Sequence, residues 1–181
     1  MKPPVRIADL IGTCVTRTSL KLIASLQAID PLFTGVHYLY GHYTDVKERL
    51  IEYGKTDKQD KYPLVVFFED YRVKVEKPGI FGIADAKLII VTPTQAPITR
   101  AQREANFTQI LIPIYDELFR QMKRSGFFMQ YGPFPHNRID RPHWGDPAIY
   151  GNKGYLFNDI LDGIEITDLQ LQTYFNNCVT A

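Results

Sequence analysis

The sequence contains few of the residues and runs that identify specialised classes of protein. Only two of its 181 residues are cysteines, Cys14 and Cys178, and their wide separation fits neither a disulfide framework nor a zinc site. The longest apolar run, LVVFF at 64–68, is too short to span a membrane. The opening MKPPVRIADL has no apolar stretch of the secretory type. We therefore expect a soluble, unexported protein with reduced thiols and no membrane contact.

The chain also has no marked excess of charge. It carries 21 Lys and Arg against 20 Asp and Glu, a net charge of +1 that provides no field for drawing it onto DNA or acidic lipid. The distribution is uneven, because residues 1–29 hold four basic residues against one acidic residue, whereas residues 155–181 hold four acidic residues and no basic one. The two ends are expected to attract each other, within a chain or between chains.

Catalytic motifs are absent from the part of the sequence with the clearest structural pattern, residues 62–124. The overall composition is 45% apolar and 13% aromatic, which is ample for a buried core. One domain over residues 1–181 is the expectation for this length. The clearest elements are therefore scaffold, and they name no reaction.

The first 61 residues predict two helices and two strands. Apolar residues at helical spacing predict a helix over 4–18. The segments 20–29 and 33–40 are predicted strands, separated by a turn at 30–32. A short helix over 44–53 is expected to begin with Thr44 as its N-cap and to bury Val46, Leu50 and Ile51. The charged run at 55–61 is typical of a solvated loop.

A long hairpin and a helix follow. A turn at 76–79 makes residues whose numbers sum to about 156 face one another, so LVVFF pairs with LIIVT. The fully apolar halves then form a base covered on both faces, and the alternating halves RVKVE and GIADA form a tip that projects from the core. In this register Glu69 lies opposite Lys87 as an ion pair. Glu69 and Asp70 are interpreted as structural, because neighbouring strand residues point to opposite faces.

The helix over 99–124 is expected to open with a capping box of Thr99 and Gln102 and to end at Ser125 and Gly126. Pro113 lies in the middle and predicts a kink. The predicted buried stripe consists of Phe107, Ile110, Leu111, Ile114, Leu118 and Met122.

Residues 130–154 read as an ordered but irregular loop, since they hold four Gly, four Pro and the only Trp. Possible metal ligands in it are His136, Asp140, His143 and Asp146, although their spacing matches no site template. The stretch GDPAIYGNKGY does not have the spacing of a phosphate-binding loop, so nucleotide binding is rejected.

The last regular segment, GIEITDLQLQTYF, alternates as a strand whose apolar side changes parity, which predicts a bulge at Thr167 and Asp168. Residues 176–181 are expected to fray. The element order predicts an α+β fold: a mixed, mostly antiparallel sheet with a long hairpin, packed on one side by two or three helices.

The order YPLVVFFED, AKLIIVTPT, ITRAQREANFTQILIPIYDELFRQM and IYGNKGYLFNDILDGIEITDLQL resembles structural proteins of tailed bacteriophages, of the tail-terminator or tail-completion type of head-to-tail connector ring. Similar chains occur in phages that infect Bacteroidetes, including crAss-like phages. The resemblance covers residues 36–172. It implies a tail-terminator-like virion protein that forms a hexameric or dodecameric ring with itself, around a channel through which DNA passes without sequence-specific binding. It implies no catalytic residues, no metal and no cofactor.

Under this hypothesis the hairpin tip at 71–87 and the loop at 130–154 contact neighbouring subunits or adjoining portal, connector or tail proteins. The predicted interface residues are Arg72, Lys74, Trp144, Asp146 and Tyr150, with the two aromatic residues as anchors.

Two alternatives remain from the residues themselves. A small metal-dependent hydrolase or nuclease would use Asp140, His143 and Asp146. A nucleic-acid-binding module would use the basic residues of the long helix, although acidic residues interleave with them and favour a solvated helix face. That basic set is Arg100, Arg103, Arg120, Lys123 and Arg124.

Overall fold

The structure is a computed structural model, and it describes residues 6–53, 61–77, 80–94, 99–129, 132–144 and 160–174. The helices are α1 (Ile7–Ile29), α2 (Tyr43–Tyr53), α3 (Arg100–Ala105), the π-helical segment η2 (Asn106–Leu111) and α4 (Ile112–Arg124). The strands are β1 (His37–Gly41), β2 (Leu64–Phe68), β3 (Arg72–Lys77), β4 (Ile80–Pro93), β5 (Asn137–Trp144) and β6 (Leu161–Tyr174).

The six strands form one sheet in the order β1-β2-β4-β6-β5, and β3 pairs with the part of β4 that extends beyond β2. Only β1 and β2 pair in parallel, while β2–β4, β3–β4, β4–β6 and β5–β6 are antiparallel. This arrangement confirms the predicted α+β fold with a mostly antiparallel sheet. No helix in the described part of the chain is long and apolar enough to cross a membrane.

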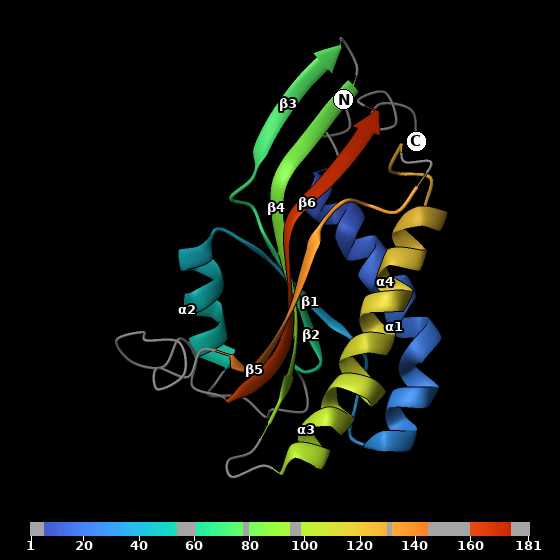
Figure 1. The fold of residues 1–181 in the computed structure, drawn as a ribbon, viewed down its shortest axis with the longest axis vertical. Helices are drawn as coiled ribbons and strands as arrows, with labels where there is room; N and C mark the ends of the chain where they lie inside the picture. Colours follow the sequence, from blue (N-terminus) through green and yellow to red (C-terminus); the bar gives the residue numbers. More distant parts are fainter. Residues whose placement is uncertain are drawn as a thin grey trace.

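Helices cover both faces of the sheet rather than one (Figure 1). In β2, Val65 and Phe67 face the core that contains the buried residues of α1 and α4. The alternate residues Leu64, Val66 and Phe68 face a second core with Val46 and Leu50 of α2. The prediction was two or three helices on one side of the sheet. Two of them, α1 and α4, share one side, whereas α2 covers the opposite face, because a strand that is apolar at every position needs cover on both faces.

The first helix is much longer than predicted, and the predicted strand at 20–29 is wrong. Residues 20–29 continue α1, and Leu22 and Leu26 extend the buried stripe of Cys14, Val15 and Thr18 at helical spacing. The segment is rich in Leu, Lys, Ala and Gln, which favour helices. The chain then turns at 31–32, where the Asp30 side chain accepts a hydrogen bond from the Leu32 amide.

The short helix α2 also starts earlier than expected. It begins at Tyr43, whose amide donates to the Asp70 carboxylate at 3.1 Å, so Thr44 is not its N-cap. Val46 and Leu50 are buried as predicted, whereas Ile51 is 36% exposed. Asp70 also hydrogen-bonds His42 at 2.8 Å, which gives this acidic residue a structural role at the start of the helix.

The predicted register of the hairpin is confirmed at the tip, but at the base the observed pairing differs from it by one residue. Val73 faces Ile83 as predicted, but Phe68 faces Lys87. The chain leaves the β2–β4 ladder at Glu69, whose amide donates instead to the Gly41 carbonyl. The expected Glu69–Lys87 ion pair is therefore wrong, and Lys87 pairs with Glu165 at 2.5 Å.

Two neighbouring bulges divide the long strands β4 and β6. The pairing shifts between Ile83 and Ala86 and again before Leu88, and Asp85 and Asp168 have left-handed φ values of 62° and 55°. The second irregularity confirms the bulge predicted at 167–168. Beyond the bulges, β3, β4 and β6 extend upward past α2 as the upper part of the sheet, hereafter the arm (Figure 1).

The long helix has the predicted limits. Thr99 and Gln102 form the capping box. The helix ends with Ser125 as its C-cap, and Gly126 follows with φ +70°. The expected stripe is buried except for Phe107, which is half-buried. Just before Pro113, the π-helical segment η2 bonds the Ile112 amide to the Phe107 carbonyl, five residues back.

Two other predictions were an irregular loop over residues 130–154 and reduced thiols at the two cysteines. Residues 137–144 form the edge strand β5 and not an irregular loop, because their backbone pairs with β6. Cys14 is free and buried, and burial raises the pKa of its thiol to about 11. Cys178 and the tail at 176–181 lie outside the described residues.

Candidate aromatic pocket

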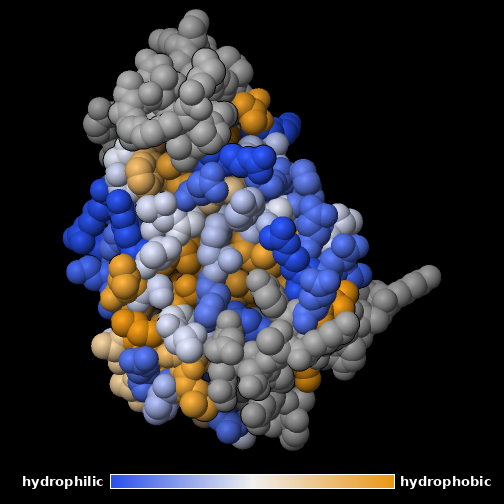
Figure 2. Space-filling view, turned by 180° about the vertical axis from the view of Figure 1, so that it is seen from behind, coloured by the Kyte–Doolittle hydropathy of each residue, from blue (hydrophilic) through white to orange (hydrophobic). Residues whose placement is uncertain are grey.

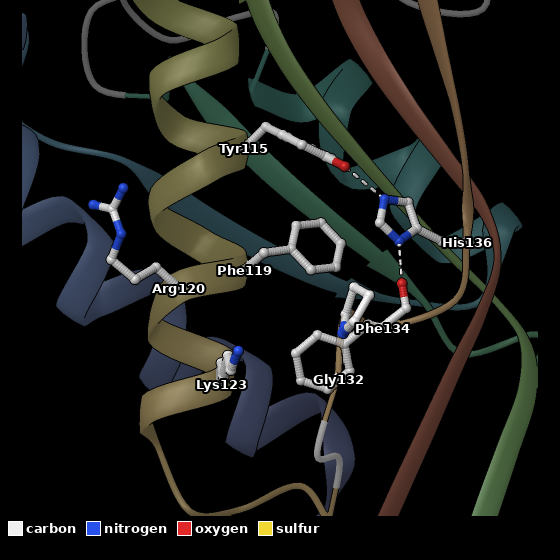
Figure 3. Close-up of a pocket in the computed structure, with 8 residues that line it drawn as sticks. Tyr115, Phe119, Arg120, Lys123, Gly132, Phe134 and His136 are labelled. Atoms are coloured by element: carbon white, nitrogen blue, oxygen red, sulfur yellow. Dashed lines mark hydrogen bonds between the residues drawn. The ribbon is translucent and has the colours of Figure 1, made fainter.

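A pocket of about 380 Å³ opens between α4 and residues 132–136, the segment that leads into β5 (Figure 3). Its walls combine aromatic rings with two cationic side chains. The lining residues are Tyr115, Phe119, Arg120 and Lys123 from α4, and Gly132, Pro133, Phe134 and His136 from the segment.

The helix geometry explains why these side chains meet. Tyr115 and Phe119 are four residues apart, so they lie one above the other on the flank of α4, next to its buried stripe of Ile114, Leu118 and Met122. Their ring centroids are 4.9 Å apart. On the other wall Phe134 is buried, and it fixes the segment by packing 5.9 Å from Phe119, centroid to centroid.

His136 holds the two walls together. Its ring stacks on Phe119 with centroids 4.5 Å apart and an angle of 12° between planes. Its Nδ1 lies 2.6 Å from the Phe134 carbonyl oxygen, and its Nε2 lies 2.6 Å from the Tyr115 hydroxyl. A carbonyl oxygen can only accept, so Nδ1 carries the proton, and in the neutral ring Nε2 accepts from Tyr115.

The cationic side chains lie at the end of α4. Arg120 is half-exposed and pairs with the buried carboxylate of Glu117, which also accepts a hydrogen bond from Gln121 at 2.6 Å. Lys123 is exposed and forms no ion pair within the described part of the chain. Arg138 lies 4.9 Å above the Tyr115 ring, at the other side of the pocket.

These contacts restrict what the pocket can bind. The polar atoms of Tyr115 and His136 are already hydrogen-bonded to each other and to the backbone. Burial raises the pKa of Tyr115, so its hydroxyl stays a neutral donor at ordinary pH. The inserted part of a ligand must therefore be apolar, and a negative charge is favoured where Lys123 and Arg120 lie.

The structure places the predicted interface residues in different environments. Arg72 is on the arm, with 77% of its side chain exposed, and pairs with Asp85. Lys74 is in the same strand, but its side chain is not among the parts that the structure describes. Asp146 and Tyr150 lie outside the described residues. Trp144 is only 8% exposed and packs in the second core, so its side chain stabilises this chain's own fold.

The possible metal ligands do not come together in the described residues. Asp140 is exposed and pairs with Arg138 at 2.9 Å, while His136 belongs to the pocket. His143 adopts a left-handed φ of 50°, and its backbone amide donates to the buried carboxylate of Asp162. No group of three His, Cys, Asp or Glu with metal-binding geometry occurs among the residues that the structure covers. Asp146, the third residue of the hydrolase hypothesis, lies outside them.

The basic residues of the long helix are partly neutralised by neighbours. Arg100 pairs with Glu104 at 2.7 Å, and Arg120 pairs with Glu117. Arg103 lines a second depression of about 390 Å³ together with Glu104 and Asp140. Acidic groups therefore lie beside most of these cations, as expected for a solvated helix face.

The aromatic pocket was not predicted as a site. Its signal in the sequence is the Tyr115 and Phe119 pair beside the buried stripe, which predicts an aromatic flank on the helix. The second wall has no such signal, because the path of residues 132–136 depends on the pairing of β5 with β6.

No family model matches this chain, and no curated protein matches it.

Proposed function

We propose that this protein is a structural subunit of a tailed-phage virion that assembles into a ring at the head-to-tail interface or tail end. The ring contains six or twelve copies and surrounds the channel through which DNA passes. The support is the resemblance of residues 36–172 to tail-terminator and tail-completion proteins, together with a fold that offers surfaces for assembly.

The observation that carries the proposal is the arm. β3 pairs with β4 alone, so one edge of this strand has no partner strand among the described residues. Its Val73 is 55% exposed and Arg72 projects into solvent. An exposed edge strand offers unpaired backbone groups to another chain, and Val73 adds an apolar contact there.

The two borders of the sheet differ from each other. β1 and β3 lie on one border, and β5 lies on the other, where Ile139 is 37% exposed. Contacts between unlike surfaces repeat from copy to copy and form rings when the rotation closes. A chain with distinct surfaces at opposite borders is suited to this kind of assembly.

The test is the mass of the purified full chain, measured by light scattering coupled to size exclusion, with negative-stain images of the same sample. We expect closed rings of six or twelve copies, alone or after addition of the neighbouring portal or tail proteins. A chain that remains monomeric in both conditions contradicts the proposal.

Val73→Lys tests the contribution of the arm to assembly. It places a charge on the exposed edge of the arm without altering the core, so it should reduce assembly and leave the melting temperature unchanged. Leu20→Lys is the control, because Leu20 is 74% exposed on α1, away from the arm.

A further inference from the structure

We infer that the aromatic pocket binds a small aromatic carboxylic acid, whose ring inserts between α4 and residues 132–136 and whose carboxylate lies beside Lys123. This binding site goes beyond the proposed ring and does not depend on it.

The pocket has the size and the lining of a site for a small molecule. Its volume of about 380 Å³ is near the lower end of the range for such sites, roughly 300–1,000 Å³, so it suits an occupant of one or two rings. Its walls carry the rings of Tyr115, Phe119, Phe134 and His136 (Figure 3). Neighbouring ring centroids there are 4.5–5.9 Å apart, a spacing at which aromatic rings attract one another. A planar ring that enters the pocket therefore gains further contacts of the same kind.

The walls disfavour a sugar, a nucleobase or a peptide. The Tyr115 hydroxyl and both ring nitrogens of His136 are already hydrogen-bonded. Pro133, which also lines the pocket, has no backbone N–H to offer. A polar occupant would lose its hydrogen bonds to water on entering and would find few replacements. The inserted part of the ligand is therefore an apolar ring.

Charge decides which polar group the ring carries. Aromatic walls can also hold a cation, as in the cages that bind quaternary ammonium groups. Here, however, no lining residue is acidic, and Lys123 lines the pocket without an ion pair among the described residues. Arg120 is paired with Glu117 and points away from the rings in Figure 3, and Asp116 is exposed and does not line the pocket. An anion beside Lys123 is favoured and a cation is repelled.

A comparison with other parts of the surface shows that this lining is specific. The second depression has a similar volume of about 390 Å³, but Phe107 is its only aromatic residue, and Glu104 and Asp140 lie beside its arginines. On the far side of the molecule, hydrophobic residues are interspersed with hydrophilic ones (Figure 2). Of the two depressions, only the aromatic pocket combines several rings with a cation and no carboxylate.

Three probes that share one naphthalene skeleton test the site by calorimetric titration of the full chain. Naphthoate is an anion, naphthylmethanol is neutral, and naphthylmethylamine is a cation at neutral pH. We expect one naphthoate per chain, bound about fivefold more tightly than the alcohol and about tenfold or more above the amine, because Lys123 attracts the first and repels the last. Equal binding of the three probes, or tightest binding of the amine, would overturn the charge assignment.

Variants at the wall identify the residues that hold the ligand. Lys123→Gln should weaken naphthoate about fivefold and leave the alcohol unchanged. Arg124→Gln is the matched control, since Arg124 is exposed next to Lys123 and does not line the pocket, and it should change naphthoate binding by less than about twofold. Equal effects of the two substitutions would contradict the role of Lys123.

Gly132→Leu tests the location of the site without disturbing the core. Gly132 lines the pocket, its φ is not in the left-handed region, and an added Cβ would meet no atom within 4 Å. The variant should keep the melting temperature of wild type and weaken all three probes by about tenfold, because the new side chain occupies space at the wall. Unchanged naphthoate binding in this folded variant would place the ligand elsewhere and overturn the inference.

A peptide that ends in phenylalanine carries the same two groups, a ring and a carboxylate. An acetylated tripeptide of this kind should bind more weakly than naphthoate, because its backbone amides find few partners in the walls. Tighter binding of the peptide would overturn the assignment to a small acid. The titrations do not require assembly, so a failure of the pocket leaves the ring standing, and a monomeric chain leaves the pocket standing.

Discussion

The lower and upper parts of the sheet use the same strands for opposite purposes. In the base, Leu88 to Val91 of β4 are fully buried, with α1 and α4 on one face and α2 on the other. In the arm the same strand pairs with β3, where Val73 is 55% exposed. One strand therefore holds the fold together at one end and offers a surface at the other.

The buried base changes into the exposed arm at the two bulges. Asp85 and Asp168 have left-handed φ values, and the pairing of β4 with β6 shifts on both sides of them. A bulge moves the following side chains to the other side of the ladder and bends the strand. The arm is therefore a continuation of the sheet that the two bulges set apart, and substitutions at matched positions should affect it less than the base.

The largest difference is expected for apolar truncations. Leu88→Ala in the base should lower the free energy of unfolding by about 2–5 kcal/mol, because it leaves a cavity in a fully buried core. Val73→Ala in the arm should cost under about 0.5 kcal/mol, since the side chain is exposed. Urea denaturation measures both. Equal costs would mean that the arm is as deeply packed as the base.

Ion pairs should show the next difference. In the base, the carboxylate of Glu165 is buried and pairs with Lys87 at 2.5 Å and Arg141 at 2.8 Å. Glu165→Gln should cost about 1–3 kcal/mol near neutral pH. Arg72→Gln, which breaks the exposed pair with Asp85 in the arm, should cost under about 1 kcal/mol.

The pH dependence of the Glu165 effect follows from its pKa. Burial raises this pKa, but the hydrogen bonds from Lys87 and Arg141 outweigh burial, so the net pKa is lower than usual. The stabilisation is present above the ordinary Glu value and is lost as the pH falls through the lowered pKa. The difference between wild type and Glu165→Gln should therefore shrink in acid. A difference that grows as the pH falls through this range would contradict the account of the pair.

The junction between the two parts is tested at Asp168. Asp168→Val should cost about 1–3 kcal/mol, because a β-branched residue strains the left-handed backbone. Asp168→Asn should stay within about 0.5 kcal/mol, since Asn tolerates that conformation. The side-chain oxygen of Asn can still accept the hydrogen bond that Asn137 donates to Asp168 at 2.7 Å, so Asn137→Ala measures that contact separately, and thermal unfolding compares the three variants.

The smallest effect is expected at the start of α2. The hydrogen bond that His42 donates to the Asp70 carboxylate raises the pKa of His42 and lowers the pKa of Asp70. The His42 contribution is complete below its unfolded pKa and is lost as the pH rises through the folded pKa. The Asp70 contribution is lost as the pH falls. In Asp70→Asn, NMR titration should show the His42 pKa returning toward its usual value, and an unchanged titration would contradict the contact.

Local signals in the sequence predicted much of this fold. The capping box at Thr99, the end of the long helix at Gly126 and the bulge at Asp168 each depend on a few neighbouring residues. The register of β3 on β4 follows from one turn. These features are predictable because their causes lie close together in the chain.

The parts that the sequence did not predict depend on distant contacts. Residues 20–29 have mixed periodicity, and packing against the sheet decides for helix. β5 is largely exposed and lacks alternation, so only its pairing with β6 makes it a strand. The pocket joins Tyr115 to His136, 21 residues apart, through a segment whose path β5 sets.

The most direct test of the proposed ring is the mass of the assembled particle. The full chain, alone or together with the neighbouring portal or tail proteins, should form closed particles of six or twelve copies in native mass spectrometry. Val73→Lys should lower the proportion of these particles, because it places a charge on the exposed edge of β3. A chain that remains monomeric in both conditions would contradict the account.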